Sequence, residues 1–277
     1  MSLILVVVAF FLVMGLIVRL MENRLAYFPT PFPENFGEPS HYGLNLEDVF
    51  LTTSDGKRIH GWFHPVSESP SVLLWFHGNA GNLADRMDHL QILSLLGVNV
   101  FAIDYRGYGK SEGSPDEEGI YRDADAAYRF LTEKKEFDPA RIIVYGISLG
   151  SAVAMDLAVR KRCAGLILSA PFTSAREMTR RMFRIPFLEY FPRTRFDNLR
   201  KIAQIRVPVL ILHGTQDDLV PFEMGKRLFE AANEPKTFFP VEGAGHNDIY
   251  VIAQEDYLDQ MRKFVDFSSQ EEEAVER

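Results

Sequence analysis

The stretch Gly146-Ile147-Ser148-Leu149-Gly150 decides the fold, because it places a serine between two glycines where a strand gives way to a helix. Residues 141–145 are apolar and β-branched and predict a buried strand, whereas residues 151–159 are rich in helix formers. Glycines allow a strand to turn sharply into a helix, and such a turn lifts the serine hydroxyl out of the fold. The N–H of Leu149, at the start of the helix, would then point to where an oxyanion forms.

Composition narrows the class of protein. The chain has 277 residues, of which 47% are hydrophobic and 25% charged, as in globular proteins. The net charge of −8 argues against a general role in nucleic-acid binding. The single cysteine, Cys163, lies in an apolar stretch, so it predicts a small buried side chain and excludes a disulfide framework.

The amino-terminal stretch is not typical of a globular domain. Residues 3–18 contain no polar side chain, and as a helix they approach the thickness of a bilayer core. A cleaved signal peptide would need a basic region before this run, and only Met1-Ser2 precedes it, so we expect an uncleaved transmembrane anchor over residues 1–21. Arg19 and Arg24 follow the run, which weakly favours a single-pass protein with its catalytic domain in the cytoplasm.

The rest of the chain alternates between strand and helix patterns. Residues 22–45, rich in Pro and Phe, predict an extended linker that leaves the membrane and lies over the domain. Expected strands are residues 46–53 and 58–64, which form a hairpin, and residues 72–76, 98–103, 141–145, 165–169, 207–212 and 237–240; expected helices are residues 83–96, 118–134, 151–159, 222–232 and 248–267. Residues 268–277 predict an acidic, frayed tail.

This alternation predicts an α/β fold over residues 46–267, with a mostly parallel central sheet and helices on both faces. In such sheets the chemistry takes place beyond the carboxyl ends of the strands. Loops that begin at strand ends are therefore candidate site loops; they start at His77, Asp104, Gly146, Ala170, His213 and Glu242.

One segment, residues 171–206, interrupts the alternation. It carries nine basic and three acidic side chains among several Met, Phe and Tyr residues. We interpret it as a short helical lid whose apolar face packs on the domain. The alternative is a basic and aromatic surface that, with the linker, contacts anionic lipid.

Two later strand ends supply partners for Ser148. Serine is a weak nucleophile unless a base accepts its proton, and the base needs an acid to orient it. One strand end contributes residues 213–221 and the next contributes residues 243–248. Ser148, Asp217 and His246 follow the chain order nucleophile, acid, base that belongs to this kind of turn.

Taken together, these motifs resemble the serine α/β-hydrolases and, more narrowly, their Bem46 and ABHD13/ABHD17-like branch. The resemblance covers about residues 46–267. An amino-terminal membrane segment followed by an aromatic and Pro-rich stretch also resembles that branch. The stretches that carry it are His77-Gly78-Asn79-Ala80-Gly81-Asn82, Asp104-Tyr105-Arg106-Gly107-Tyr108-Gly109-Lys110-Ser111, residues 146–150, residues 213–221 and Gly245-His246-Asn247-Asp248.

The resemblance implies roles for particular residues. Ser148 would be the nucleophile and His246 the base, and Asp217 fits the family's H-G-x-x-D-x-x-V-P spacing as the acid. Asp218 remains an alternative acid. The backbone N–H groups of Leu149 and Asn79 would bind the oxyanion, the latter because related enzymes use the residue after His-Gly.

Other polar residues favour structural roles. We expect His77 and His213 to bond loop backbone, Asp104 and Arg106 to tie loops together, and Asp248 to cap the final helix. Lys110-Ser111 resembles the end of a phosphate-binding loop, but the glycine that such a loop requires at position 104 is Asp. The four histidines 41, 60, 64 and 89 have no metal-ligand spacing.

The predicted function is a membrane-anchored serine hydrolase that acts on an ester or thioester of a small or lipid-like acyl substrate by two-step acyl transfer, without a cofactor or metal. A serine aminopeptidase-like peptidase is the alternative enzyme, because the same superfamily contains such peptidases. A membrane-tethered scaffold without activity is the alternative from another class, although the presence of Ser148, Asp217 and His246 argues against it.

Overall fold

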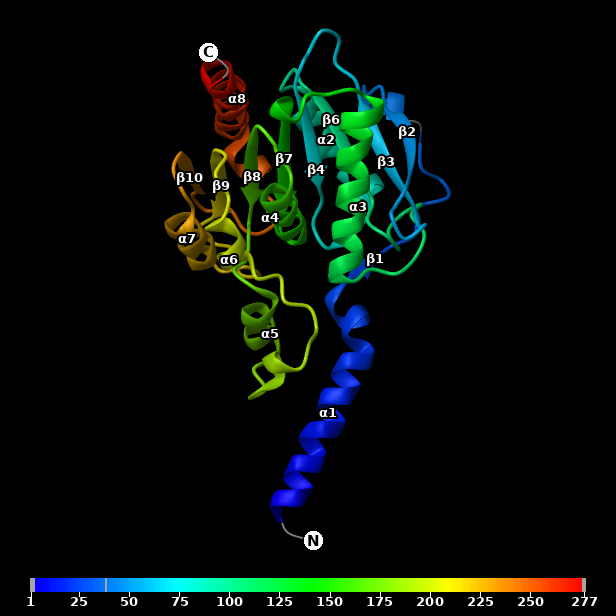
Figure 1. Ribbon diagram of the computed structural model, residues 1–277, viewed down its shortest axis with the longest axis vertical. Coiled ribbons are helices and arrows are strands. Elements are labelled where there is room, and N and C mark those ends of the chain that lie inside the picture. Colours follow the sequence, from blue (N-terminus) through cyan, green and yellow to red (C-terminus); the bar gives the residue numbers. More distant parts are fainter. Residues whose placement is uncertain (1–2, 38, 276–277) are drawn as a thin grey trace.

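A central sheet organises the molecule. In the computed structural model, which describes residues 3–37 and 39–275, eight strands follow the order β10-β9-β8-β7-β4-β6-β3-β2 (Figure 1). The strands from β10 to β6 pair in parallel, whereas β3 pairs antiparallel with β6 and with β2. The predicted α/β fold with a hairpin at one edge of the sheet is therefore confirmed.

The strands are β1 (Phe28–Pro29), β2 (Glu47–Thr52), β3 (Arg58–His64), β4 (Val72–Phe76), β5 (Ala80–Gly81), β6 (Asn99–Ile103), β7 (Ile142–Ile147), β8 (Gly165–Ser169), β9 (Val209–Gly214) and β10 (Lys236–Val241). The helices are α1 (Leu3–Ala26), α2 (Met87–Ser94), α3 (Glu117–Arg129), α4 (Leu149–Arg160), α5 (Ala175–Phe183), α6 (Asn198–Ile202), α7 (Phe222–Ala231) and α8 (Ile249–Val275).

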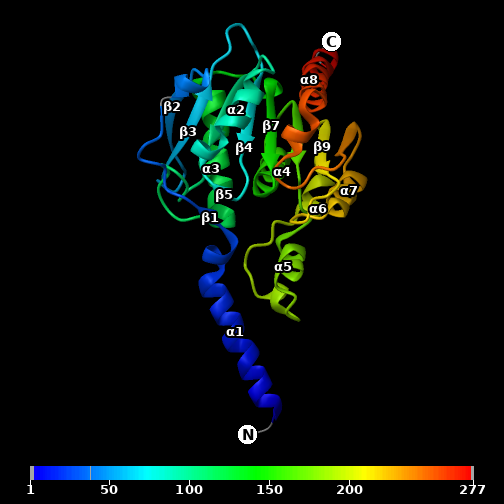
Figure 2. The same cartoon turned by 180° about the vertical axis from the view of Figure 1, so that it is seen from behind.

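Helices cover both faces of the sheet, which explains why its inner strands are continuously apolar. In β4, Val72, Leu74 and Phe76 pack into one core cluster, while Leu73 and Trp75 pack into the other. The first cluster contains residues of α3, α4, α6 and α7, and the second contains residues of α2 and α8. Accordingly, α3 lies in front of the sheet in Figure 1 and α2 lies in front of it in Figure 2.

Two expected helices differ from the structure. The helix expected over residues 83–96 begins with a separate 3-10 turn at Leu83–Arg86, which Asn82 and Asp85 cap reciprocally, and α2 starts only after it. The final helix, α8, continues to Val275, where the sequence predicted a frayed tail from residue 268 onward. Cys163 is buried, as expected.

The segment that follows α1 lies on the domain. Strand β1 pairs in parallel with β5, and the N–H of Phe32 donates to the carbonyl of Gly109. Phe32 and Phe36 pack their rings against each other and against Trp62, with centroid separations of 5.0 to 6.0 Å. Residues 28–36 are therefore part of the same folded unit as the central sheet.

The lid segment (residues 171–206) contains α5, a short 3-10 turn at Leu188–Tyr190, and α6. Figures 1 and 2 both show α1 and α5 at the same end of the molecule. Some basic side chains of the lid segment have partners within the segment itself: Arg180 pairs with Glu189, and Arg176 lies over the ring of Tyr190.

Helix α1 requires a correction to the sequence-based prediction. Over residues 3–37 and 39–275, the structure contains no helix that is both long enough and apolar enough to cross a membrane. The single-pass anchor expected over residues 1–21 is therefore not supported, and the cytoplasmic placement that depended on it loses its basis. One face of α1 instead packs on the lid segment, where Glu22 is buried.

Candidate active site

The turn between β7 and α4 holds Ser148 in a strained conformation. Its φ and ψ angles are 51° and −112°, in a region that non-glycine residues rarely adopt. A Cβ on Gly146 would lie 2.2 Å from the Gly150 carbonyl oxygen, and one on Gly150 would lie 2.0 Å from the carbonyl oxygen of Phe76. Both glycines are therefore required by close backbone approach, which is the reason for the sequence pattern.

We expect Gly150→Ala to destabilise the protein by about 3 kcal/mol, because its Cβ would meet the backbone of β4, which cannot yield as a flexible side chain can. Gly37→Ala is the matched control, since its Cβ would meet only a ring nitrogen of His41 at 3.4 Å. Urea unfolding of both variants measures the difference. Equal stability of the two variants would contradict the tight packing of the turn.

The structure brings the three predicted catalytic residues together. Nε2 of His246 lies 3.1 Å from Oγ of Ser148, and Nδ1 of the same ring lies 2.7 Å from Oδ2 of Asp217. These residues are 98 and 29 positions apart in the chain, and each lies in the loop that follows a strand of the sheet. The imidazole can therefore pass a proton to or from the serine while the carboxylate orients it.

Asp217 is fixed as an anion. Its Oδ1 accepts hydrogen bonds from the N–H groups of Leu219 and Val220, at 3.0 and 2.7 Å. Burial raises the pKa of this carboxyl, but the hydrogen bonds from His213 and His246, the charge of His246 and the Val220 N–H outweigh burial and hold the pKa below its usual range. By contrast, Asp218 is exposed.

The two predicted oxyanion donors lie near Ser148. Leu149 is the first residue of α4, so its N–H has no partner in a preceding turn, and the Ser148 side chain does not cap the helix. A Cβ on Gly78 would be 3.8 Å from Cβ of Ser148, which places the Gly78-Asn79 loop beside the serine. Leu149 and Asn79 both line the cavity described next.

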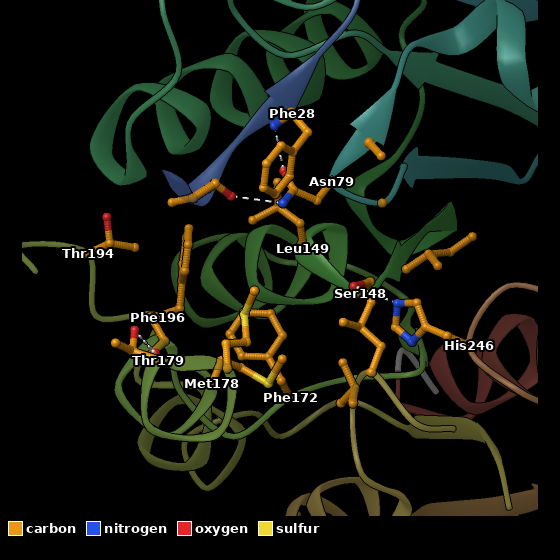
Figure 3. Close-up of a pocket in the computed structure, with 18 of the residues that line it drawn as sticks. Phe28, Asn79, Ser148, Leu149, Phe172, Met178, Thr179, Thr194, Phe196 and His246 are labelled. Carbon is orange, nitrogen blue, oxygen red and sulfur yellow. Dashed lines mark hydrogen bonds between the residues drawn. The ribbon is translucent and has the colours of Figure 1, made fainter. Parts of the chain in front are cut away.

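A cavity of about 890 Å³ opens from Ser148 and His246. In Figure 3 these two residues lie at one end and Thr194 and Phe196 at the other. The walls are mostly apolar and come from α1, the lid segment and the loops around Ser148; they include Met14, Val18, Leu25, Phe172, Met178, Met182, Phe183, Ile185, Leu188 and Phe196. A chamber of this size and character suits an apolar small molecule or acyl chain.

The other polar residues hold the loops. Nδ1 of His77 lies 2.7 Å from the Gly78 carbonyl, and Nε2 of His213 lies 2.9 Å from the Val220 carbonyl, so the expectation that these histidines bond loop backbone is confirmed. Asp104 is fully buried between His77 and His60. Burial raises its pKa, but hydrogen bonds with both rings outweigh that effect and lower it.

Arg106 and Asp248 also brace loops. Arg106 pairs with Asp55 in the hairpin turn and with Asp123 on α3, as expected of a residue that ties loops together. Asp248, expected to cap the final helix, immediately precedes α8, and its carboxylate accepts a hydrogen bond from the N–H of Gly245. This bond steadies the loop that carries His246.

Sequence reasoning missed how the Asn79 side chain is used. Its amide donates to the Ala26 carbonyl at 2.8 Å, and its oxygen accepts from the Phe28 N–H and from the hydroxyl of Tyr108. Figure 3 shows this side chain turned toward Phe28. The end of α1 is thus tied to the loop beside Ser148, across more than 50 residues of sequence, and no local pattern signals such a contact.

Comparisons with known proteins found relatives in sequence and in fold. Residues 67–201 match the family model described as "Serine aminopeptidase, S33". An uncharacterised protein of Mycobacterium tuberculosis is 38% identical over 254 residues, covering 88% of this chain and 87% of that protein. The human alpha/beta hydrolase domain-containing protein 17B is 37% identical over 228 residues, covering 79% of this chain and 75% of that protein. An esterase of Pyrococcus furiosus has a similar fold, with a TM-score of 0.72 and 23% identity over 86% of this chain and 98% of that one.

Proposed function

The chain belongs to the α/β-hydrolase superfamily and to its ABHD17-like branch, and on this basis we propose that it is a serine hydrolase that cleaves carboxylic esters or thioesters. The observation that carries the proposal is the position of the His246 ring, 3.1 Å from Oγ of Ser148 and 2.7 Å from Oδ2 of Asp217. A base held between a nucleophile and an orienting acid has the geometry that acyl transfer needs.

In the first step, Oγ of Ser148 attacks the substrate carbonyl carbon while Nε2 of His246 accepts the hydroxyl proton. Negative charge develops on the carbonyl oxygen, which the N–H groups of Leu149 and Asn79 stabilise. The bond to the alcohol or thiol then breaks, and the leaving group takes the proton from His246. The acyl group remains on Ser148.

In the second step, water attacks the acyl-enzyme and gives its proton to His246. The bond between the acyl carbon and Oγ breaks, the carboxylic acid leaves, and the proton returns to Ser148. While His246 holds the extra proton in each step, the ionised Asp217 carboxylate stabilises the imidazolium, and the lowered pKa of this carboxyl keeps it ionised.

Ester cleavage is favoured over aminopeptidase activity, the second candidate that the family model suggests. An aminopeptidase needs an acidic group to bind the substrate's free ammonium group. Among the residues that the structure describes, two carboxylates line the cavity. Glu22 accepts hydrogen bonds from the N–H groups of Arg193 and Thr194, and Asp85 accepts one from the N–H of Asn82. Both are already engaged with backbone.

We therefore expect p-nitrophenyl esters to be hydrolysed with a kcat/KM at least about 10²-fold above that of aminoacyl p-nitroanilides, because an unpaired ammonium in this cavity costs about 3 kcal/mol. Parallel assays of the two substrate series measure the ratio. A higher kcat/KM for the anilides would identify a peptidase. Hydrolysis of neither series by folded protein would instead favour a scaffold.

A further inference from the structure

One face of α1 is used differently from the rest of the helix. Met14, Gly15, Val18, Glu22 and Ala26 are buried or half-buried and recur every three or four residues, so they form one stripe. The opposite side is open to solvent, where Leu16 and Leu20 are 59% and 76% exposed. The helix thus presents one particular face to the domain.

That face is fastened to the lid segment. The Glu22 carboxylate, only 7% exposed, accepts hydrogen bonds from the backbone N–H groups of Arg193 and Thr194. Nε of Arg19 donates to the Phe191 carbonyl at 3.2 Å, and a Cβ on Gly15 would lie 2.4 Å from the ring of Phe191. The spacing between α1 and the lid segment is therefore set by close contacts along about two turns.

The two ends of α1 lie at different distances from the proposed nucleophile. Ala26 is hydrogen-bonded to Asn79, whose loop lies beside Ser148, so the carboxyl end of α1 is next to the chemistry. At a rise of 1.5 Å per residue, Val18 lies about 12 Å and Met14 about 18 Å farther along the helix. Both side chains line the cavity that begins at Ser148.

The wall that faces α1 across the cavity is equally apolar. It is formed by the lid-segment residues Phe172, Met178, Met182, Phe183, Ile185 and Leu188. Figure 3 shows Phe172 and Met178 on the side of the pocket opposite Phe28 and Asn79. Methionine side chains adapt to flexible apolar ligands. Among the residues that the structure describes, Glu22 is the only α1 carboxylate that lines this cavity, and it already accepts hydrogen bonds from backbone.

We propose that α1 forms one wall of the acyl-chain site and that Val18 and Met14 set the length of chain accepted. The inference rests on the proposed function, since it assumes that the carbonyl of the substrate is bound at Ser148. The chain then lies between α1 and the lid segment, passing Val18 first and Met14 about one turn later. Neither residue touches the reacting atoms; both determine specificity.

The test compares p-nitrophenyl esters from acetate to palmitate on the full chain. For the wild type, kcat/KM rises by up to about fourfold per methylene buried, equivalent to ~0.8 kcal/mol each. Val18→Trp keeps kcat/KM for acetate within about twofold but lowers it at least tenfold for long chains. Met14→Trp does the same, starting at longer chains.

Leu20→Trp and Leu16→Trp are the matched controls, because they add the same ring to the exposed side of α1. We expect their chain-length profiles to match the wild type. Val18→Ala is a second variant, which tests the same position if Val18→Trp does not fold. We expect it to raise kcat/KM for long or branched chains relative to kcat/KM for acetate. The inference would be overturned if the chain-length profiles of Val18→Trp, Val18→Ala and Met14→Trp all matched the wild type. It would also be overturned if the two control variants shifted the profile equally.

Binding of free fatty acids of the same lengths, measured by calorimetry, separates this inference from the proposed function because it does not require Ser148 to react. If the wild type hydrolyses no ester but Val18→Trp still truncates the binding profile, the proposed function fails and the role of α1 stands. If esters are hydrolysed but neither profile responds to Val18 and Met14, the role of α1 fails and the hydrolase stands.

Discussion

Ser148→Ala is expected to lower kcat for ester hydrolysis by about 10⁴- to 10⁶-fold, the largest effect of any single substitution in this chain. Its hydroxyl is the group held 3.1 Å from Nε2 of His246, and without it no acyl-enzyme can form. The rate that remains is that of uncatalysed water attack assisted by the oxyanion donors and by substrate binding. Steady-state assays with p-nitrophenyl esters measure the loss.

The Ser148→Ala result needs a control for the fold. Ser94→Ala removes a hydroxyl that bonds only within α2, and we expect it to keep full activity. Thermal unfolding of both variants shows whether the turn is intact. A Ser148→Ala protein that folds normally and retains more than about a hundredth of the wild-type kcat would contradict the assignment of the nucleophile.

Asp217→Asn is expected to lower kcat by about 10⁴-fold. The carboxylate accepts a hydrogen bond from the Nδ1–H of His246 at 2.7 Å and so selects the tautomer whose Nε2 can accept a proton from Ser148. An amide in the same place can present its NH₂ group to the ring and select the wrong tautomer. It also removes the negative charge that stabilises the imidazolium.

Asp218→Asn is the matched control, because it changes the neighbouring carboxylate, which sequence reasoning left open as the acid. Asp218 is exposed, whereas the Asp217 side chain is buried against His246 and accepts hydrogen bonds from two backbone N–H groups. We expect kcat of Asp218→Asn to stay within about twofold of the wild type, the size expected for an exposed charge. The reverse order of effects would show that the acid had been assigned to the wrong neighbour.

The parts of the fold that were predictable have causes that act locally. Strands such as β4 are buried on both faces, so they appear in the sequence as short, uninterrupted apolar runs. The turn at Ser148 carries glycines at the two positions where any side chain would meet backbone. Ser148, Asp217 and His246 each follow a predicted strand. Because the carboxyl ends of parallel strands lie at the same edge of a sheet, all three were expected there.

The role of α1 could not be predicted in the same way. A run of residues that is apolar on every face fits a bilayer-spanning helix and also a helix packed on a protein, and periodicity cannot separate the two. The contacts that hold α1 against the lid segment are long-range: Gly15 lies against Phe191, and Glu22 accepts hydrogen bonds from backbone N–H groups more than 170 residues away. The side-chain bonds of Asn79 to residues 26 and 28 are non-local for the same reason.

The most direct test of the central claim is to identify the residue that a fluorophosphonate modifies. This reagent attaches to a serine only when a neighbouring base activates it, so the wild type should gain one adduct, mapped by peptide mass spectrometry to Ser148. Ser148→Ala should gain none, and Asp217→Asn should react far more slowly. Folded wild-type protein that remains unmodified, or that carries the adduct on another residue, would contradict the account.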